Sequence, residues 1–182
     1  AEQKITADAA QEALLPKLDR LQQAVLTPVR RGFFRKAAPA PKGLYIWGGV
    51  GCGKSFLMDL FVDTLSGDVR RVHFHSFMQE VQGALHEARK TATKDALAQV
   101  AKDIAKDLKL LALDEMQIKD IADAMIVGRL FELLFGHGVA VITTSNRPPK
   151  DLYKNGLNRQ LFMPFIALFE SALVIHPMQG DT

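Results

Sequence analysis

Apolar side chains recur at helical spacing near the start of the chain. The positions that share one helix face within residues 8–26 are Leu14, Leu18, Leu21 and Val25. Pro16 lies inside this segment, and because proline has no backbone N–H to donate, we expect it to kink or restart the helix. Residues 27–42 contain five basic residues, three prolines and no acidic residue, so they predict an extended connector.

Beyond residue 42, short apolar runs alternate with longer amphipathic segments. The apolar runs predict strands at 43–47, 69–75, 110–113, 139–144 and 172–177. The longer segments predict helices at 54–65, 76–90, 94–107, 120–135 and 158–171. Ser76 and Gln79 have the spacing of a capping box at the start of the second of these helices. This alternation predicts right-handed βαβ crossovers and a layered α/β domain.

Composition adds limits to this picture. The chain has 182 residues, of which 48% are apolar and 24% charged, which fits one globular core and excludes wholesale disorder. Its single cysteine excludes an internal disulfide and favours a reducing, cytoplasmic compartment. A net charge of +3 does not by itself indicate nucleic acid, and no apolar run reaches the roughly 18 residues of a membrane span. The first residues lack a signal-peptide core, and because the chain starts at Ala1 we expect it to be trimmed.

A glycine-rich segment between the first predicted strand and the next helix carries the clearest chemistry. Residues 48–55 read GGVGCGKS and satisfy the pattern G-x-x-x-x-G-K-[ST] of a phosphate-binding loop. The glycines let backbone N–H groups turn toward an anion, and the helix N-terminus adds partial positive charge. We expect Lys54 to reach the β- and γ-phosphates and the Ser55 hydroxyl to bind Mg²⁺. A bare turn would require neither side chain. The predicted nucleotide contacts are Gly48, Gly49, Val50, Gly51, Cys52, Gly53, Lys54, Ser55 and Phe56.

Two acidic residues follow the apolar run 110–113, which is typical of a strand buried on both faces. If that strand neighbours the one before the phosphate loop, Asp114 would lie beside Ser55 and hold Mg²⁺. Glu115 would then polarise the attacking water as a general base. The alternative is a pair of ordinary solvated acids. An acid that activates water favours an ATPase over a small nucleotide kinase.

The next strand ends in the polar residues Thr144, Ser145 and Asn146. The Asn146 amide is suited to hydrogen-bond both the γ-phosphate and the attacking water. Turn chemistry before Pro148 and Pro149 is the alternative explanation.

Arg159 begins the last predicted helix. A guanidinium stabilises charge on a transferring phosphoryl group well, and a neighbouring subunit that supplied it would make hydrolysis depend on assembly. An exposed surface arginine is the alternative, and Arg147 and Arg129 are weaker candidates for the same role.

Several segments together resemble the ZapE family of AAA+ ATPases, bacterial division-associated enzymes with a mitochondrial relative. These segments are IWGGVGCGKSFLMDLF, RVHFHSFM, LLALDEMQIKDIADAMIVGRLFELLF and VAVITTSNRPPKDLYKNGLNRQLFMPFI. The resemblance runs from about Asp8 to Ile175, and DIADAMI and TSNRPPKDLY are far more specific than the loop. It implies an AAA+ fold, ATP with Mg²⁺, ring-like oligomers, and action at the membrane-associated division ring or in membrane protein quality control.

The resemblance also implies roles for single residues. The loop 48–55 corresponds to the Walker A motif, and Asp114 with Glu115 corresponds to Walker B. Asn146 corresponds to the sensor, and Arg159 fits the position of the arginine finger. Asp8 to Gln11 resembles the family's N-terminal D-x-x-Q, in which Gln11 would read the adenine edge, with a surface helix as the alternative.

The predicted fold is therefore a P-loop NTPase: a three-layer αβα sandwich with a parallel five-stranded sheet of AAA+ type. Family members continue beyond the last predicted strand, so the chain is expected to lack a complete C-terminal lid. The predicted divisions are a helical segment 1–26, a basic connector 27–42, the AAA+ core 43–177 and a tail 178–182.

Two basic stretches leave alternatives open. Arg70, Arg71, His73 and His75 fit a half-exposed edge strand better than a nucleic-acid contact, and the two histidines lack a third zinc ligand of suitable spacing. The basic residues of 27–42 fit a solvated linker, or a surface for anionic lipid with Phe33 and Phe34 as anchors.

Three functions fit these motifs. The leading one is an ATPase that remodels or regulates a protein partner such as a division-ring filament, as a self-associating ring in the cytoplasm or at the inner membrane. The others are a helicase-loader-like ATPase on single-stranded DNA and a nucleotide-gated adaptor that needs no turnover. A phosphotransferase fits less well.

Overall fold

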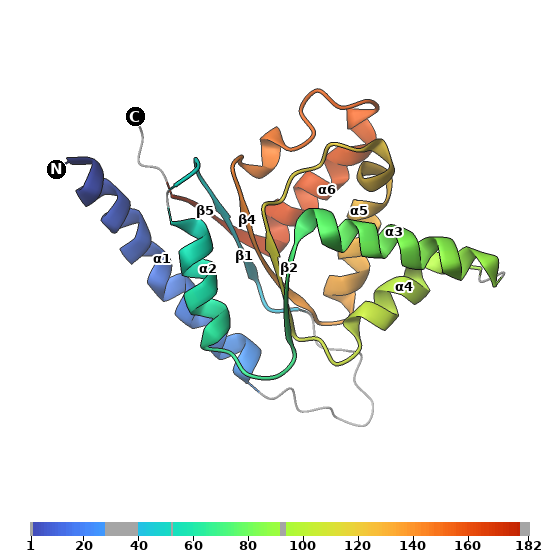
Figure 1. Ribbon diagram of the computed structural model, residues 1–182, viewed down its shortest axis with the longest axis horizontal. Coiled ribbons are helices and arrows are strands. Elements are labelled where there is room, and N and C mark those ends of the chain that lie inside the picture. The colour runs from blue at the N-terminus through green and yellow to red at the C-terminus, as the bar shows by residue number, and fades with distance from the viewer. Residues whose placement is uncertain (1, 28–39, 52, 92–93, 179–182) are drawn as a thin grey trace.

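The computed structural model describes residues 2–27, 40–51, 53–91 and 94–178, with side chains from Ala9 onward (Figure 1). Its helices are α1 (Glu2–Leu26), α2 (Lys54–Asp63), α3 (Phe74–Lys90), α4 (Ala96–Ala105), α5 (Ile121–Gly136), the 3₁₀ helix η1 (Pro149–Asp151) and α6 (Arg159–Ala172). Its strands are β1 (Gly43–Trp47), β2 (Val69–His73), β3 (Leu110–Asp114), β4 (Ala140–Ser145) and β5 (Leu173–Pro177). Most of the predicted connector, together with Cys52 and the residues after 178, lies outside the described residues.

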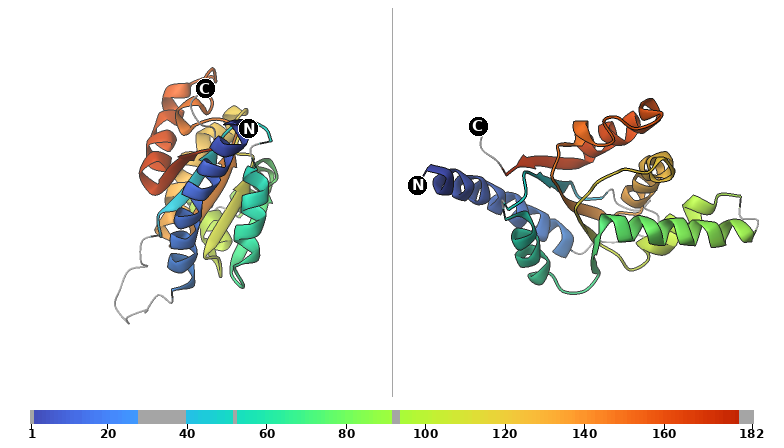
Figure 2. Two further views of the ribbon diagram at one scale, coloured as in Figure 1. Left: turned by 90° about the vertical axis from the view of Figure 1, so that its left-hand side faces the viewer. Right: turned by 45° about the horizontal axis from the view of Figure 1, so that its top comes forward.

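All five strands pair in parallel, in the order β2-β3-β4-β1-β5. Helices α1 and α2 cover one face of the sheet, and α3, α4, α5 and α6 cover the other (Figures 1 and 2). Strands β3 and β4 are buried along their whole length, whereas the edge strand β2 is partly exposed. The predicted parallel five-stranded α/β fold and the predicted half-exposed edge strand are therefore confirmed.

Alternating side chains on the strands build two separate cores. On the first face, Ile46 and Ile142 pack with Leu14 and Leu21 of α1. On the other face, Tyr45, Leu111 and Val141 pack with the helices that carry most of the phenylalanines. Phe131 and Phe169 meet edge to face there, with ring centroids 5.1 Å apart. Helices thus cover both faces of the sheet, and the carboxyl ends of the parallel strands form one common edge.

The restart expected at Pro16 and the capping box expected at Ser76 are both wrong. Helix α1 runs without a restart through Pro16, because its four buried apolar side chains hold it against the sheet and outweigh a cost of about 3 kcal/mol for an interior proline. Helix α3 begins at Phe74, so Ser76 lies inside its first turn and His75 lies on the helix. No side chain caps α3, because its apolar face already begins at the buried Phe74 and continues through Phe77.

Aspartates cap the two following helices. Asp95 Oδ1 accepts the Ala98 N–H at 3.2 Å, and Asp120 Oδ1 accepts the Ala122 N–H at 2.8 Å. None of the helices within the described residues is long and apolar enough to span a bilayer.

Candidate nucleotide site

The phosphate-binding loop joins the carboxyl end of β1 to the first turn of α2. Gly51 and Gly53 have φ of 83° and 84°, a left-handed conformation that would strain any residue with a Cβ atom. Gly48 N–H donates to Ser145 O at 3.1 Å, which fastens the loop to the end of β4. The Lys54 ammonium donates to Gly48 O at 2.7 Å and to Gly49 O at 2.8 Å. The loop therefore has the backbone of an anion-binding nest, with the lysine folded onto its carbonyl groups.

A cavity of about 360 Å³ lies over this loop and over the tips of two strands. Its lining residues are Val50, Gly51, Gly53, Lys54, Ser55, Phe56, Glu115, Thr144, Ser145 and Asn146. The structure thus brings the predicted loop, the second acid and the polar strand tip to one cavity. The condition that β3 neighbours β1 is wrong, because β4 lies between them. Since all three strands end at the same edge, Glu115 still reaches the cavity from β3, and the tip of β4 lines it as well.

Glu115 has a left-handed backbone, with φ of 58°. Its N–H donates to Thr144 Oγ1 at 3.0 Å, and the next N–H, of Met116, donates to Thr144 O at 2.7 Å. Strained conformations of this kind persist where the surroundings fix them, and they concentrate at functional sites. The carboxylate lies 3.7 Å from His73 Nδ1, a neighbour that sequence reasoning missed although parallel pairing sets His73 opposite Asp114.

Asp114 is buried, with a side chain only 7% exposed, and both of its carboxylate oxygens accept hydrogen bonds from Arg71. This pair raises the pKa of the Arg71 guanidinium above its ordinary value, chiefly through the hydrogen bond to Asp114. The sequence interpretation treated Arg71 as an ordinary cation of the edge strand. The missed signal is the register of β2 and β3, which a sequence does not fix by itself.

The donor set at this edge fits magnesium. The Ser55 hydroxyl opens α2 and the Asp114 carboxylate ends β3, and both are the oxygen ligands that Mg²⁺ prefers. Among the described residues no group of three or more His, Cys, Asp or Glu side chains forms a metal site. Two protein ligands are enough when nucleotide phosphates and water complete the octahedron, as is usual for Mg²⁺ bound with a nucleotide.

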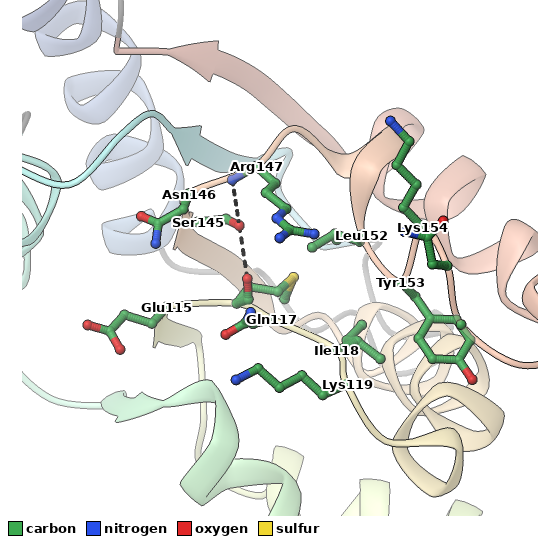
Figure 3. Close-up of a pocket in the computed structure, with 13 residues that line it drawn as sticks. Glu115, Gln117, Ile118, Lys119, Ser145, Asn146, Arg147, Leu152, Tyr153 and Lys154 are labelled. Carbon is green, nitrogen blue, oxygen red and sulfur yellow. Dashed lines mark hydrogen bonds between the residues drawn. The ribbon is translucent and has the colours of Figure 1, made fainter.

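A second cavity, of about 510 Å³, adjoins the first and shares Glu115, Ser145 and Asn146 with it. In Figure 3, Glu115 and Asn146 lie at one end of this cavity, and Leu152 and Tyr153 lie at the other. Ser145 Oγ donates to Met116 O at 2.9 Å and so ties the wall between the two cavities to the segment after β3.

The three candidate arginines lie in different places. Arg147 lines the second cavity. Arg129, on α5, donates to Asp95 Oδ1 at 2.9 Å. Arg159, at the start of α6, donates to Lys150 O at 2.6 Å and does not line the nucleotide cavity. In the described part of this chain, Arg159 therefore lies outside the nucleotide cavity.

Gln11 approaches the loop from α1. Its Nε2 atom lies 3.0 Å from the point where a Cβ atom on Gly53 would stand, so the amide packs against the loop backbone. The neighbouring Ala10 O accepts a hydrogen bond from His176 Nε2 at 3.0 Å, which fastens this part of α1 to β5. Contact between Gln11 and adenine stays a prediction.

The sequence profile of the AFG1-like ATPase family matches residues 1–181. The chain belongs to the AFG1-like ATPase family. It is 44% identical to the cell division protein ZapE of Escherichia coli over 126 aligned residues. The aligned region covers 69% of this chain and 33% of ZapE. It is 46% identical to lactation elevated protein 1 homolog B of Danio rerio over 140 aligned residues. That aligned region covers 71% of this chain and 28% of the fish protein.

An uncharacterized protein of Schizosaccharomyces pombe is 42% identical over 165 residues, which cover 82% of this chain and 36% of the yeast protein. The resemblance to the ZapE family is thus confirmed. The chain spans about a third of the length of these curated relatives.

Solved structures support the fold of this AFG1-like chain. The crystal structure of the DnaC helicase loader matches with a TM-score of 0.61 at 13% identity, over 93% of this chain and 90% of DnaC. The replication initiator DnaA, bound to AMPPCP and single-stranded DNA, matches with a TM-score of 0.54 at 20% identity, over 95% of this chain and 46% of DnaA. At these identities the likeness shows the fold alone.

Proposed function

We propose that this chain binds ATP with Mg²⁺ and hydrolyses it to ADP and phosphate. The observation that carries this proposal is the single cavity lined by Lys54, Ser55, Glu115 and Asn146. A nucleoside triphosphate makes use of all these groups at once: a nest for its phosphates, a lysine for their charge, and an acid beyond them.

Each residue has a distinct task in the proposed reaction. Lys54 exchanges its bonds to the loop carbonyls for the β- and γ-phosphates. Glu115 orients the attacking water and accepts its proton, and Asn146 fixes the water and the γ-phosphate. Ser55 and Asp114 would hold Mg²⁺, which supplies neutralisation of the developing phosphate charge. Val50, Gly51 and Phe56 line the cavity beside the phosphates, and the remaining loop residues supply backbone N–H groups.

For the cellular role we propose a ring-forming ATPase that remodels or regulates a protein partner in cell division. The support for cell division is the likeness to ZapE, which is named a cell division protein, and the support for a ring-forming ATPase is the AAA+ fold. The proposed location is the cytoplasm, with peripheral contact at the inner membrane where a division ring forms.

Two substitutions test the catalytic proposal. Lys54→Ala removes the cation that binds phosphate and should weaken ATP affinity at least about 10-fold. Glu115→Gln keeps the shape of the side chain but removes the base, so it should retain ATP binding and lower turnover by about 100-fold or more. Phosphate release and equilibrium binding of a fluorescent ATP analogue measure the two effects. Glu170→Gln, an exposed site on α6, is the matched control.

If Glu115→Gln hydrolyses ATP at the wild-type rate, the assigned base is wrong. Adding purified division filaments or single-stranded DNA to the same assay separates the proposed partner class from a DNA-directed ATPase, because only the true partner should raise turnover.

A further inference from the structure

Arg71 lies on the same side of the sheet as the candidate magnesium ligands. Parallel pairing sets Arg71 opposite Ala112, two residues before Asp114. Because side chains alternate along a strand, Ala112, Asp114 and Arg71 all face α2. The neighbouring Arg70 faces the opposite way and pairs with Glu80 of α3. The edge strand therefore directs one arginine to each side of the sheet.

The Arg71 guanidinium binds Asp114 in a bidentate manner. Nε donates to Oδ2 at 2.7 Å and Nη2 donates to Oδ1 at 3.0 Å. A fork of this kind fixes the carboxylate plane as well as its position. Each carboxylate oxygen has two lone pairs, so one on each oxygen stays available for a metal ion or its bound water. The pair can thus orient Asp114 without occupying it fully.

The third nitrogen of the same guanidinium contacts a second acid. Arg71 Nη1 donates to Asp59 Oδ1 of α2. Asp59 comes four residues after Ser55, so the two lie on one face of α2, one turn apart. Arg71 therefore connects the helix that carries Ser55 with the strand that carries Asp114. Its side chain is only 25% exposed, which limits its freedom to leave this position.

We propose that Arg71 is a positioning residue that sets the separation of the Ser55 hydroxyl and the Asp114 carboxylate. It would thereby govern the part of nucleotide affinity that depends on Mg²⁺. This inference rests on the proposed function, since it concerns the metal that accompanies ATP. The described residues that line the nucleotide cavity include Ser55 but neither Asp114 nor Arg71, so Arg71 would act through Asp114 and α2.

The decisive measurement is the ratio of nucleotide affinities with and without the metal. The dissociation constant of a non-hydrolysable fluorescent ATP analogue is measured in EDTA and in excess Mg²⁺, for wild type, Arg71→Gln and Arg70→Gln. Removal of groups that orient metal ligands typically weakens metal affinity by about 10- to 100-fold, so Arg71→Gln should lower the ratio about 10-fold. Arg70→Gln removes the same charge from the same strand and should leave the ratio unchanged. Titration of Mn²⁺ by electron paramagnetic resonance, with nucleotide present, measures the metal directly.

Asp59→Asn provides a second variant, because it weakens only the link to α2 and leaves Asp114 paired. It should lower the ratio by less than Arg71→Gln does. If circular dichroism shows that Arg71→Gln does not fold, the measurement on Asp59→Asn tests the proposal instead. An unchanged ratio of nucleotide affinities in Asp59→Asn then overturns the proposal.

Three outcomes separate the possibilities. Equal ratios for Arg71→Gln and Arg70→Gln overturn the positioning role. A higher ratio in Arg71→Gln would identify Arg71 as a competitor of the metal and overturn it as well. A wild-type chain whose nucleotide affinity is the same in EDTA and in Mg²⁺ would contradict the proposed function itself.

Discussion

Thr144 fixes the backbone of the proposed general base at two points. Its hydroxyl accepts the Glu115 N–H at 3.0 Å and its carbonyl accepts the Met116 N–H at 2.7 Å. Thr144→Val keeps the shape but leaves the Glu115 N–H without its acceptor, at a cost of about 1–3 kcal/mol. We expect turnover to fall by about 10-fold or more, because small displacements of a catalytic group are costly, while ATP affinity stays within about twofold. Steady-state phosphate release and analogue binding test this.

Thr143→Val is the matched control. The Thr143 hydroxyl is also buried and donates to Leu113 O at 2.9 Å, but Thr143 does not line the nucleotide cavity. Both variants should lose stability, and only Thr144→Val should lose turnover. Equal losses of turnover would show that general loosening of β4, and not the contact with Glu115, sets the rate.

At this scale the sequence predicts residues whose chemistry is local and misses those that depend on register. The loop 48–55 could be predicted because its glycines, lysine and serine act through their own backbone turn. The left-handed conformation of Glu115 carries no sequence signal, since glutamate rarely adopts it. The bond between Arg71 and Asp114 joins residues 43 positions apart, and only the pairing of β2 with β3 reveals it.

At the scale of elements, His176 of β5 attaches helix α1 to the sheet. Its Nε2 donates a hydrogen bond to Ala10 O. Its Nδ1 must therefore be unprotonated in order to accept a hydrogen bond from the Lys17 ammonium, at 2.8 Å. Burial lowers the pKa of His176 below its ordinary value of 6.5, and the Lys17 charge acts in the same direction against the opposing bond to Ala10. Between the lowered pKa of the folded state and about pH 6.5, the unfolded chain therefore binds more protons at this residue than the folded chain, and stability rises with pH in that window.

The prediction concerns the slope of stability against pH. The stabilising contribution of neutral His176 is present above about pH 6.5 and is lost as the pH falls through the lowered folded pKa. Wild type should lose thermal stability between pH 7.5 and pH 5.5, and His176→Asn should show a shallower loss. His86→Asn, at an exposed site on α3, should keep the wild-type slope. Identical slopes for all three proteins would contradict the attachment role.

Element type was predictable here and element ends were not. Apolar periodicity predicted all five strands and the long helices, because burial of each face decides the structure. The start of α3 was missed because the alternation through Phe74 and His75 also fits a strand, and only packing of Phe74 in the core distinguishes the two. The restart predicted at Pro16 also does not occur, because tertiary packing of α1 against the sheet overrides the local preference of proline.

At the scale of the whole molecule, the described lining of the nucleotide cavity does not include the guanidinium group that phosphoryl transfer commonly uses. Among the described residues that line it, Lys54 is present and no arginine is. Arg159 of the same chain is held by Lys150 O outside the cavity. We therefore predict that a neighbouring copy supplies Arg159, so that specific ATPase activity rises with protein concentration. Arg159→Ala should abolish this rise and leave ATP binding intact. Arg129 pairs with Asp95 instead, so the control Arg129→Ala should keep the rise in specific activity with protein concentration.

Mixing two inactive variants gives the sharpest form of this test. In a head-to-tail ring, a subunit with Arg159→Ala still carries Glu115, and a neighbour with Glu115→Gln still carries Arg159. Random mixing at equal amounts places this productive order at about a quarter of the interfaces, so hydrolysis should reappear in the mixture although neither variant alone supports it. An arginine that acted within its own chain would give no recovery, because every subunit would then lack one of the two groups. Size-exclusion chromatography of the mixture shows whether the two variants have assembled, so a silent mixture of assembled subunits would exclude the action of Arg159 between chains.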